Sequence, residues 1–429
     1  MTSMNSSWHS LRHLSVAVGL CLTSTPSAAQ ATAAGACAVN VGSSRRLELP
    51  DGRIVSVDAK SVTASGSSIL ALGPFVYTFP ADATPSTSPL PGDPLVGVLI
   101  AANGVVALVP SPLRDRRVVY ARAAAATDGA FHVLFVTGID SVDGAPAADD
   151  SATIWYAHFV RGRWGTPQQI VNTRGAALNP EFTSDLLERD GSLAVVFPFI
   201  DHRSAGSSGG LVVLRRRNGH WSSDTLRTYL PPPAARARYA TGDTLAVLFS
   251  QSVRGAKAED VYLARVSHGW SAPERIGGNS VRPVSDLSLA AIPDGFIASW
   301  STWEWLNAAS NVIEWSRIAT NGAQSAVAVL DSGAVTYPFE LVTVDGRPLW
   351  LHQGEPYGST VSYSLATDAG QPLRGRLTMP FHNSRPKAVT LSPDRTVVLT
   401  MKRGVVGAEP MIASWMTDVR IRCPRAERR

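Results

Sequence analysis

The sequence predicts an all-β repeat protein, a β-propeller, and three observations carry this prediction. A two-residue turn signal recurs along the chain, with spacings of 62, 52, 52, 51 and 48 residues between successive copies. Each signal is followed by a short apolar run bounded by turn residues, as in FHVLFVTG, TLAVLFS and TVVLTMK, which is typical of buried strands. The 35 glycines and 29 prolines, without any long amphipathic helical pattern, indicate many turns between short strands.

Every repeat has the same internal order of strands and turns. The first turns are Asp128-Gly129, Asp190-Gly191, Gly242-Asp243, Asp294-Gly295, Asp345-Gly346 and Pro393-Asp394. The second turns are Arg161-Gly162, Asn218-Gly219, His268-Gly269, Asn321-Gly322 and Ala369-Gly370. A further strand precedes the first turn, in the segments NPEFTSDLLE, RPVSDLSLAA, YPFELVTV and RPKAVTLS. One unit is therefore four antiparallel strands, with two tight turns and a long loop, which is the blade of a propeller.

The repeat count predicts seven blades, with six as the alternative. Six units are clear, and a degenerate first unit surrounds residues 65–72 and the turn Asn103-Gly104. The last unit lacks an outer strand after EPMIASWMTD, and we expect residues 45–50 (RRLELP) to supply it. Strands from both ends would then close the ring and remove its free sheet edges. Cys37 and Cys423, near the two ends of the mature chain, are expected to form a disulfide that locks this shared blade.

The first 31 residues predict an export signal. Arg12 supplies positive charge, residues 14–22 form an apolar run too short to span a bilayer, and Ala29-Gln30-Ala31 fits a signal-peptidase site. We divide the chain into a secretory signal peptide (1–31), an N-terminal segment (32–44), the propeller (45–424) and a C-terminal tail (425–429). The mature protein is expected to be secreted or periplasmic, monomeric and without a membrane span.

Charge and motifs exclude several classes of function. The formal net charge is only +5, and the one basic run, at residues 215–217, falls inside a strand pattern, so we expect no nucleic-acid partner. The sequence contains no HExxH motif, Walker loop or dinucleotide fingerprint. These absences argue against zinc proteases, P-loop enzymes and dinucleotide-dependent enzymes.

The repeats resemble the sialidase-like, BNR-type propeller repeats. The resemblance rests on DVYLARVSHGWSAPERI (260–276) and TIWYAHFVRGRWGTPQQI (153–170), and it extends over roughly residues 60–420. It implies a propeller architecture. The Asp-box of that superfamily is not intact, since residues 218–221 and 267–270 keep only its Gly and Trp. The Tyr/Phe-Arg-x-Pro motif that begins the sialidase arginine clamp is also missing, so no catalytic residue is carried over.

Strand order in such a blade places its tight turns at one end of the ring and its longer connections at the other. We call the second end the long-loop face, and binding usually lies on loops of this kind. There Trp303 and Trp305 are expected on one side of the chain, where they would stack on a sugar ring while Glu304 accepts a hydroxyl hydrogen bond. Packing of these tryptophans between blades is the alternative.

Polar residues from several loops form a second candidate site. A polar funnel at the mouth of the ring would contain Asp201, His202, Arg203, His352, Glu355, His382 and Arg385. An Asp–His pair can orient a general base and an arginine can hold a carboxylate, whereas solvated surface positions are the alternative.

An acidic loop is the one candidate for a bound ion. Its carboxylates, which would suit Ca²⁺, are Asp140, Asp143, Asp149 and Asp150. A solvated loop is the favoured interpretation, and we expect no other metal and no cofactor.

The combined prediction is an exported binding module. Its ligand would be a glycan or a protein held on the long-loop face, and we lean against an enzyme. A carbohydrate-active enzyme, either a glycoside hydrolase or a lyase with the polar funnel as its site, is the first alternative. A structural or assembly partner in the cell envelope is the second.

Overall fold

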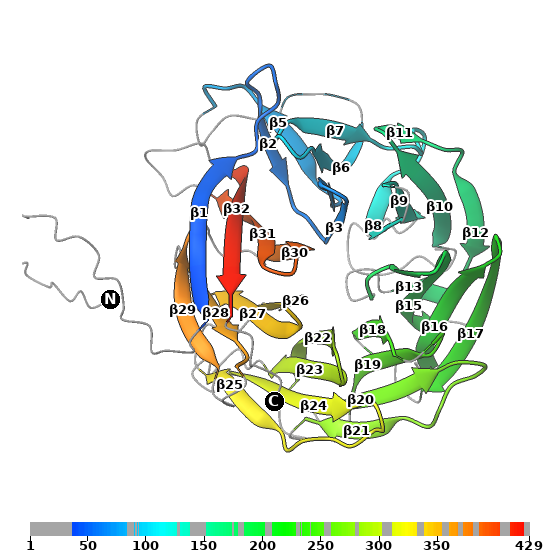
Figure 1. Ribbon diagram of the computed structural model, residues 1–429. Helices are drawn as coiled ribbons and strands as arrows, with labels where there is room; N and C mark the ends of the chain where they lie inside the picture. Colours follow the sequence, from blue (N-terminus) through cyan, green and yellow to red (C-terminus); the bar gives the residue numbers. More distant parts are fainter. Residues whose placement is uncertain are drawn as a thin grey trace, which may run out of the picture. The chain divides into compact units, whose positions relative to one another are not determined.

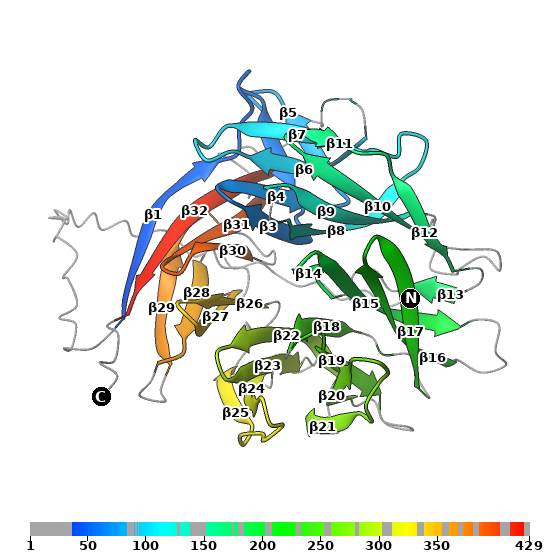
Figure 2. The same ribbon diagram turned by 45° about the vertical axis from the view of Figure 1, so that its right-hand side comes forward.

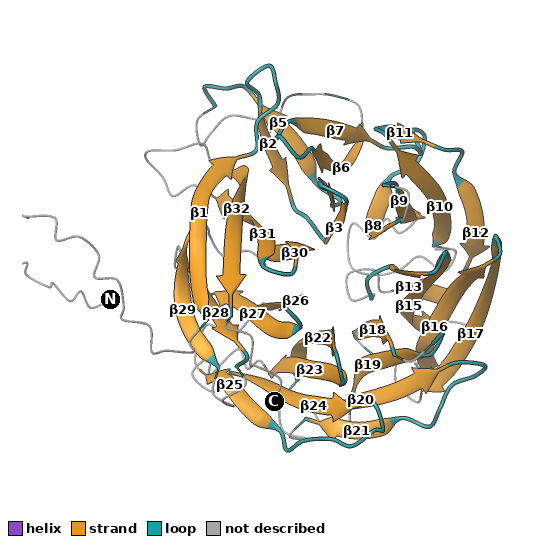
Figure 3. Ribbon diagram, viewed as in Figure 1, coloured by secondary structure: helices purple, strands orange, loops and turns teal. Residues whose placement is uncertain are grey.

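The computed structural model describes residues 37–429 apart from short gaps. The gaps are 84–89, 91, 93, 127–128, 138–151, 174–175, 179–183, 202–207, 229–231, 233, 241, 253–258, 279–282, 303–310, 333–338, 354–359, 368–371, 381–385, 404–411 and 424–429. Residues 1–36, which carry the predicted export signal, also lie outside the described part. Every regular element among the described residues is a strand (Figure 3), and none of them forms an apolar helix of the length that a bilayer requires.

Seven antiparallel sheets stand around a common axis, which confirms the predicted seven-bladed propeller (Figure 1). Blade 1 contains β3 (Ser61–Ser65), β4 (Ser68–Leu72), β6 (Leu95–Ile100) and β7 (Val106–Pro110). Blade 2 contains β8 (Val118–Ala125), β9 (Phe131–Thr137), β10 (Thr153–Val160), β11 (Arg163–Trp164) and β12 (Gln168–Asn172). Blade 3 contains β13 (Ala176–Leu178), β14 (Leu187–Arg189), β15 (Ser192–Asp201), β16 (Ser208–Arg217) and β17 (His220–Thr228).

The remaining blades repeat this order from the axis outward. Blade 4 contains β18 (Ala235–Tyr239), β19 (Leu245–Ser252), β20 (Glu259–Val266) and β21 (Glu274–Gly277). Blade 5 contains β22 (Val284–Ile292), β23 (Gly295–Thr302), β24 (Val312–Ala319) and β25 (Ala328–Ser332). Blade 6 contains β26 (Phe339–Val344), β27 (Arg347–Gln353), β28 (Thr360–Leu365) and β29 (Leu373–Thr378). Blade 7 contains β30 (Lys387–Ser392), β31 (Arg395–Arg403), β32 (Ile412–Arg422) and β1 (Ala38–Arg46).

The hydrophobic core lies between blades. Seven clusters of buried side chains each join one pair of adjacent sheets, so that every blade buries both of its faces against neighbours. Between blades 4 and 5 the fully buried indole ring of Trp300 packs directly on Gly277. A side chain at position 277 would clash with it, because its Cβ would lie 2.2 Å from the ring. Between blades 5 and 6 the indole nitrogen of Trp350 donates to Ser299 Oγ at 2.8 Å. Stacking around the axis is therefore what stabilises each sheet.

The tight turns have the backbone that their sequences predict. Positive φ angles occur at both residues of Arg161-Gly162, Asp190-Gly191, Asn218-Gly219 and Asp345-Gly346. Such paired positive angles belong to the two-residue hairpin turn whose twist matches the flanking strands. These turns close hairpins at one end of the ring, and the longer connections therefore lie at the other end.

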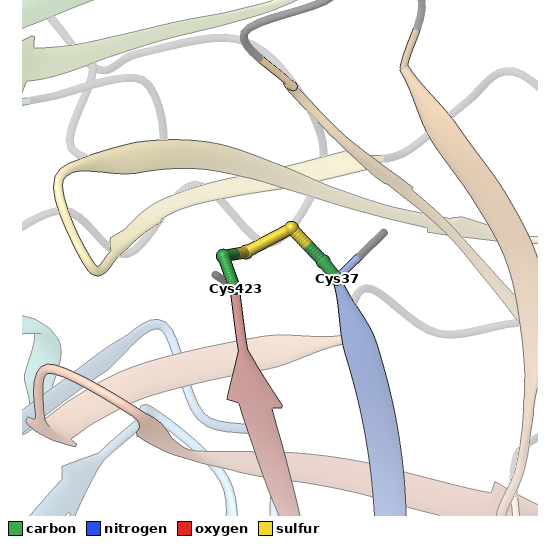
Figure 4. The surroundings of a disulfide bond; sticks show 2 residues. All are labelled: Cys37 and Cys423. Carbon is green, nitrogen blue, oxygen red and sulfur yellow. A yellow bond between two sulfur atoms is a disulfide. The ribbon is translucent and has the colours of Figure 1, made fainter. Parts of the chain in front are cut away.

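The two ends of the chain close the ring in blade 7 (Figure 4). Strand β1 pairs antiparallel with β32, from Ala38 opposite Arg422 to Arg46 opposite Trp415. The Sγ atoms of Cys37 and Cys423 are bonded just beyond this pairing, which confirms the predicted disulfide. The closing strand is β1, which includes only Arg45 and Arg46 of the expected residues 45–50. Leu47 still donates to Ser414 O at 2.8 Å, and the chain then turns to form β2.

The inner edge of blade 3 differs from its predicted strand at residues 179–188. Instead of one strand, β13 and β14 pair with the two ends of β15, and residues 184–186 lie between them without strand pairing. Ser184 replaces the missing ladder, since its backbone N–H donates to Val196 O at 3.0 Å and its hydroxyl accepts from Val196 N at 2.9 Å. The interruption leaves Asp185 at the innermost edge of the blade.

A two-stranded ribbon that the repeat pattern did not predict lies outside the seven blades. It consists of β2 (Ile54–Val57) and β5 (Val76–Phe79), which pair antiparallel. The ribbon packs Ile54 and Phe79 against Ala413 of blade 7. Both strands belong to longer connections, β2 before blade 1 and β5 within it, so the ribbon lies at the long-loop face.

Candidate functional site

Charged side chains converge at the axis of the ring. We call them the axial cluster, and they are Arg122, Asp185, Arg236, Arg238, Asp286, Glu340 and Lys387. Blades 2 to 7 each contribute at least one of them, from the inner strand or from the residues just before it.

Two ion pairs of the axial cluster join neighbouring blades. Arg236 of β18 and Asp286 of β22 approach to 3.5 Å, and their side chains are only 9% and 4% exposed. Lys387 of β30 donates to Glu340 of β26 at 2.9 Å. Because each pair joins adjacent inner strands, charge complementarity here favours the assembled ring.

Asp185 lies among cations from three other blades. Its carboxylate is 3.0 Å from Arg238 Nη2, and the charges of Arg122 and Lys387 also act on it. Burial raises the pKa of Asp185, but these cations outweigh burial and hold the pKa well below its usual range. A carboxylate held ionised in this way does not act as a general acid at neutral pH.

Arg122 differs from the other axial cations. It is 4% exposed, it donates to the carbonyl oxygen of Lys60, and its guanidinium carbon lies 4.4 Å above the Tyr120 ring. Among the described residues, no carboxylate lies within ion-pair distance of it, and its Nε has no hydrogen-bond partner. Arg122 therefore adds uncompensated positive charge beside Asp185.

Strands β5 and β7 lie side by side at the edge of the ring (Figures 1 and 2). A groove of about 910 Å³ opens at this part of the long-loop face, between the ribbon and blade 1. We call it the rim groove. Its walls come from β5, from β7, from the chain before β6 and from residues 110–118, which connect blade 1 to blade 2. This volume lies at the upper end of the range of small-molecule sites, which is enough for an oligosaccharide.

Aromatic rings line one part of the rim groove. Phe75 and Tyr77 are 45% and 38% exposed, and their nearly parallel rings lie 6.4 Å apart at an interplanar angle of 14°. They are the large aromatic side chains most exposed among the described residues. Two flat, exposed rings two residues apart in the chain offer stacking surfaces for apolar ligand faces.

Arginines line another part of the rim groove. Among the described residues, its walls contain Arg53, Arg114, Arg116 and Arg117 and one acidic residue, Asp115. All four residues from 114 to 117 are exposed. The rim groove thus combines aromatic surface with an excess of positive charge.

Most of the residues predicted as a binding site lie outside the described residues. These are Trp303, Glu304, Trp305, His202, Arg203, Glu355, His382, Arg385 and the acidic loop Asp140, Asp143, Asp149 and Asp150. Of Asp201 the structure describes the backbone, at the end of β15. Within the described part, no group of three or more His, Cys, Asp or Glu side chains is arranged to hold a metal ion.

His352 is the one residue of the predicted polar funnel whose side chain is described. It is 2% exposed and lies on β27, with its Nε2 3.5 Å from Asp331 of blade 5. Trp300, which precedes the predicted tryptophan pair, is fully buried and donates to Glu314 at 2.7 Å. Both side chains lie in the packing between strands, and neither lines the rim groove.

The sequence contained a weak signal for the rim groove. The β-branched runs IVSV and VYTF are the two strands of the ribbon, and RDRR at residues 114–117 supplies the arginines. These segments fall in or beside the degenerate first repeat, where the turn Asn103-Gly104 is the one paired turn signal. The repeat pattern therefore predicted no strands for them.

No family model matches the sequence, and no curated protein matches it either. Among solved structures, the polysaccharide lyase Uly1 has a TM-score of 0.50 at 10% identity, covering 85% of this chain and 90% of the lyase chain. An α-L-arabinofuranosidase from Fusarium graminearum has a TM-score of 0.44 at 14% identity, covering 71% and 93%. Trypanosoma rangeli sialidase has a TM-score of 0.42 at 10% identity, covering 74% and 56%. At such low identity, the likeness to the lyase shows that the chain has the propeller fold and nothing beyond the fold.

Proposed function

We propose that this protein is an exported glycan-binding module whose ligand lies on the long-loop face. The observation that carries the proposal is the stacked pair Phe75 and Tyr77 in the rim groove. Two neighbouring exposed aromatic rings beside a groove form an apolar patch of the kind at which ligands bind. Sugar rings have flat faces of C–H groups that stack on aromatic side chains and hydroxyls that take up polar contacts around them.

Export is part of the same proposal. It is supported by the predicted signal peptide at residues 1–31 and by the disulfide, since disulfides persist mainly in oxidising compartments.

An array of neutral and acidic oligosaccharides, followed by titration calorimetry with the best ligand, tests the proposal. The double variant Phe75→Ala/Tyr77→Ala is expected to weaken binding by about tenfold, because two stacking contacts are lost. Val329→Ala is the control, since Val329 is 56% exposed on the outer strand of blade 5, away from the rim groove. A protein that binds no glycan on the array contradicts the proposal.

The predicted loop site is tested in the same titrations. Trp303→Ala/Trp305→Ala removes the other pair of aromatic side chains proposed to stack on sugar. A loss of affinity in this variant alone would place the ligand on residues 303–310 and not in the rim groove. A loss in both variants would mean that one ligand extends across the long-loop face.

A carbohydrate-active enzyme is the second candidate, supported by the fold shared with a polysaccharide lyase. The test is incubation of the purified protein with the polysaccharides that it binds, with detection of new reducing ends or unsaturated sugars. Turnover would favour the enzyme, whereas binding without any cleavage would favour the module.

A further inference from the structure

We infer that the rim groove selects acidic polysaccharides, with its arginines binding the carboxylates of uronate units. This inference rests on the proposed glycan-binding function and names the chemical class of the ligand. It depends on the balance of charge in the groove, on the availability of its guanidinium groups and on the way in which the chain holds them.

The cations available in the groove are two of its arginines. Of the four arginines among the described lining residues, Arg53 pairs with Asp51 at 2.8 Å and Arg117 has partners of its own. Arg114 and Arg116 have no carboxylate partner among the described residues, whereas three of the axial cations have one within 3.5 Å. The charges of Arg114 and Arg116 are therefore the ones available to an anionic ligand.

The guanidinium groups of two arginines keep their donor edges available. Arg114 is exposed and makes no ion pair or side-chain hydrogen bond with any described residue. Arg116 lies 5.0 Å above the Trp155 ring, a cation–π contact that uses its face and leaves its N–H groups unengaged. A planar guanidinium offers parallel N–H donors whose spacing matches the two oxygens of a carboxylate.

The connection that carries these arginines is anchored to its surroundings. Ser111 N donates to Pro94 O at 2.8 Å, and Trp164 Nε1 donates to Pro110 O at 2.8 Å. Within the connection, Arg116 N donates to Leu113 O at 3.1 Å. The backbone is thus held before a ligand arrives, which reduces the ordering cost of binding.

Aromatic and basic walls together explain the preference for acidic sugars. The ring of Tyr77 comes from β5 and that of Phe75 from the residue just before it, whereas Arg114 and Arg116 come from the connection between blades 1 and 2. A uronate unit carries an apolar ring face and a carboxylate at its edge. Both parts of such a unit find a matching wall in one groove, whereas a neutral sugar uses only the aromatic wall.

Titration calorimetry with oligogalacturonate and with its carboxyl-reduced, neutral counterpart tests the inference. The unmodified protein is expected to bind the acidic oligomer about tenfold more tightly than the neutral one, because charge-assisted hydrogen bonds are lost with the carboxylates. Arg114→Gln/Arg116→Gln should abolish this preference without changing the affinity for the neutral oligomer. The matched control is Arg420→Gln/Arg422→Gln, which removes the same charge from exposed positions at the far end of β32.

The outcomes separate this inference from the function on which it rests. Equal binding of both oligomers, with sensitivity to Phe75→Ala/Tyr77→Ala, overturns the acidic preference and keeps the glycan-binding module. An equal loss of acidic binding in the groove and control variants also overturns it, because net charge alone would then be responsible. Binding of no glycan on the array contradicts the proposed function itself.

Discussion

The axial cluster and the rim groove both contain arginines, but the two regions use positive charge differently. At the axis, Arg236 and Asp286 are buried and come from adjacent blades. In the rim groove, Arg114 and Arg116 are exposed and lack a carboxylate partner among the described residues. Paired charge between blades serves assembly of the ring, whereas unpaired charge at the rim is free to bind a ligand. The difference predicts that axial substitutions change stability and that groove substitutions change binding.

The largest effect is expected from Asp286→Ala. It should lower the free energy of unfolding by about 4 kcal/mol, because Arg236 would stay buried without this carboxylate. Urea unfolding followed by tryptophan fluorescence measures it. Asp115→Ala in the rim groove is the matched control, with an expected change within about 0.5 kcal/mol. Equal costs for the two variants would remove the distinction between the regions.

Removal of the disulfide should have the next largest effect. Cys37→Ser/Cys423→Ser is expected to lower the free energy of unfolding by about 3 kcal/mol, because the unfolded chain gains freedom when residues 386 positions apart are no longer joined. Urea unfolding under non-reducing conditions measures it. The folded variant keeps the ring closed through the pairing of β1 with β32, so its affinity for glycans should stay unchanged. An unaltered unfolding midpoint would show that β1 and β32 close the ring without covalent help.

The smallest effect concerns Asp185 and depends on pH. Its pKa in the folded protein lies below the ordinary value of 3.8, so its ionised form stabilises the fold above that pH, and this contribution is lost as pH falls toward the folded pKa. Asp185→Asn should therefore cost about 1 kcal/mol at pH 7, a modest amount because the side chain is 44% exposed. Unfolding midpoints from pH 7 to pH 3 measure it. A difference between the two proteins that persists unchanged at pH 3 would contradict this account.

Local sequence signals predicted most of the scaffold. The Asn-Gly and Asp-Gly pairs predicted hairpin turns because only a few residue types tolerate the positive φ that those turns need, as at Asn218 and Asp345. Strand patterns failed where the chain departs from the repeat. The inner edge of blade 3 breaks around Asp185, and Ser184 supplies hydrogen bonds there that no periodicity encodes.

The candidate site was predicted only as a face of the molecule. Strand order identified the long-loop face, but the residues chosen on it were those with conspicuous chemistry, such as Trp303 and His202. The described groove on that face is made by Phe75, Tyr77 and Arg114, which come from different segments of the degenerate first repeat. Their proximity depends on the ribbon that β2 and β5 form, and the sequence of neither strand indicates that it pairs with the other.

The sequence by itself determined the repeat, its turns, a count of seven or six blades and the pairing of Cys37 with Cys423. The turns and strands depend on neighbouring residues, whereas the number of blades and the disulfide follow from where repeats and cysteines lie along the chain. Only the tertiary structure decided which charges meet at the axis and which remain unpaired at the rim. Lys387 and Asp185 are far apart in sequence, and they come close only because ring closure brings the inner strands of all blades to one axis.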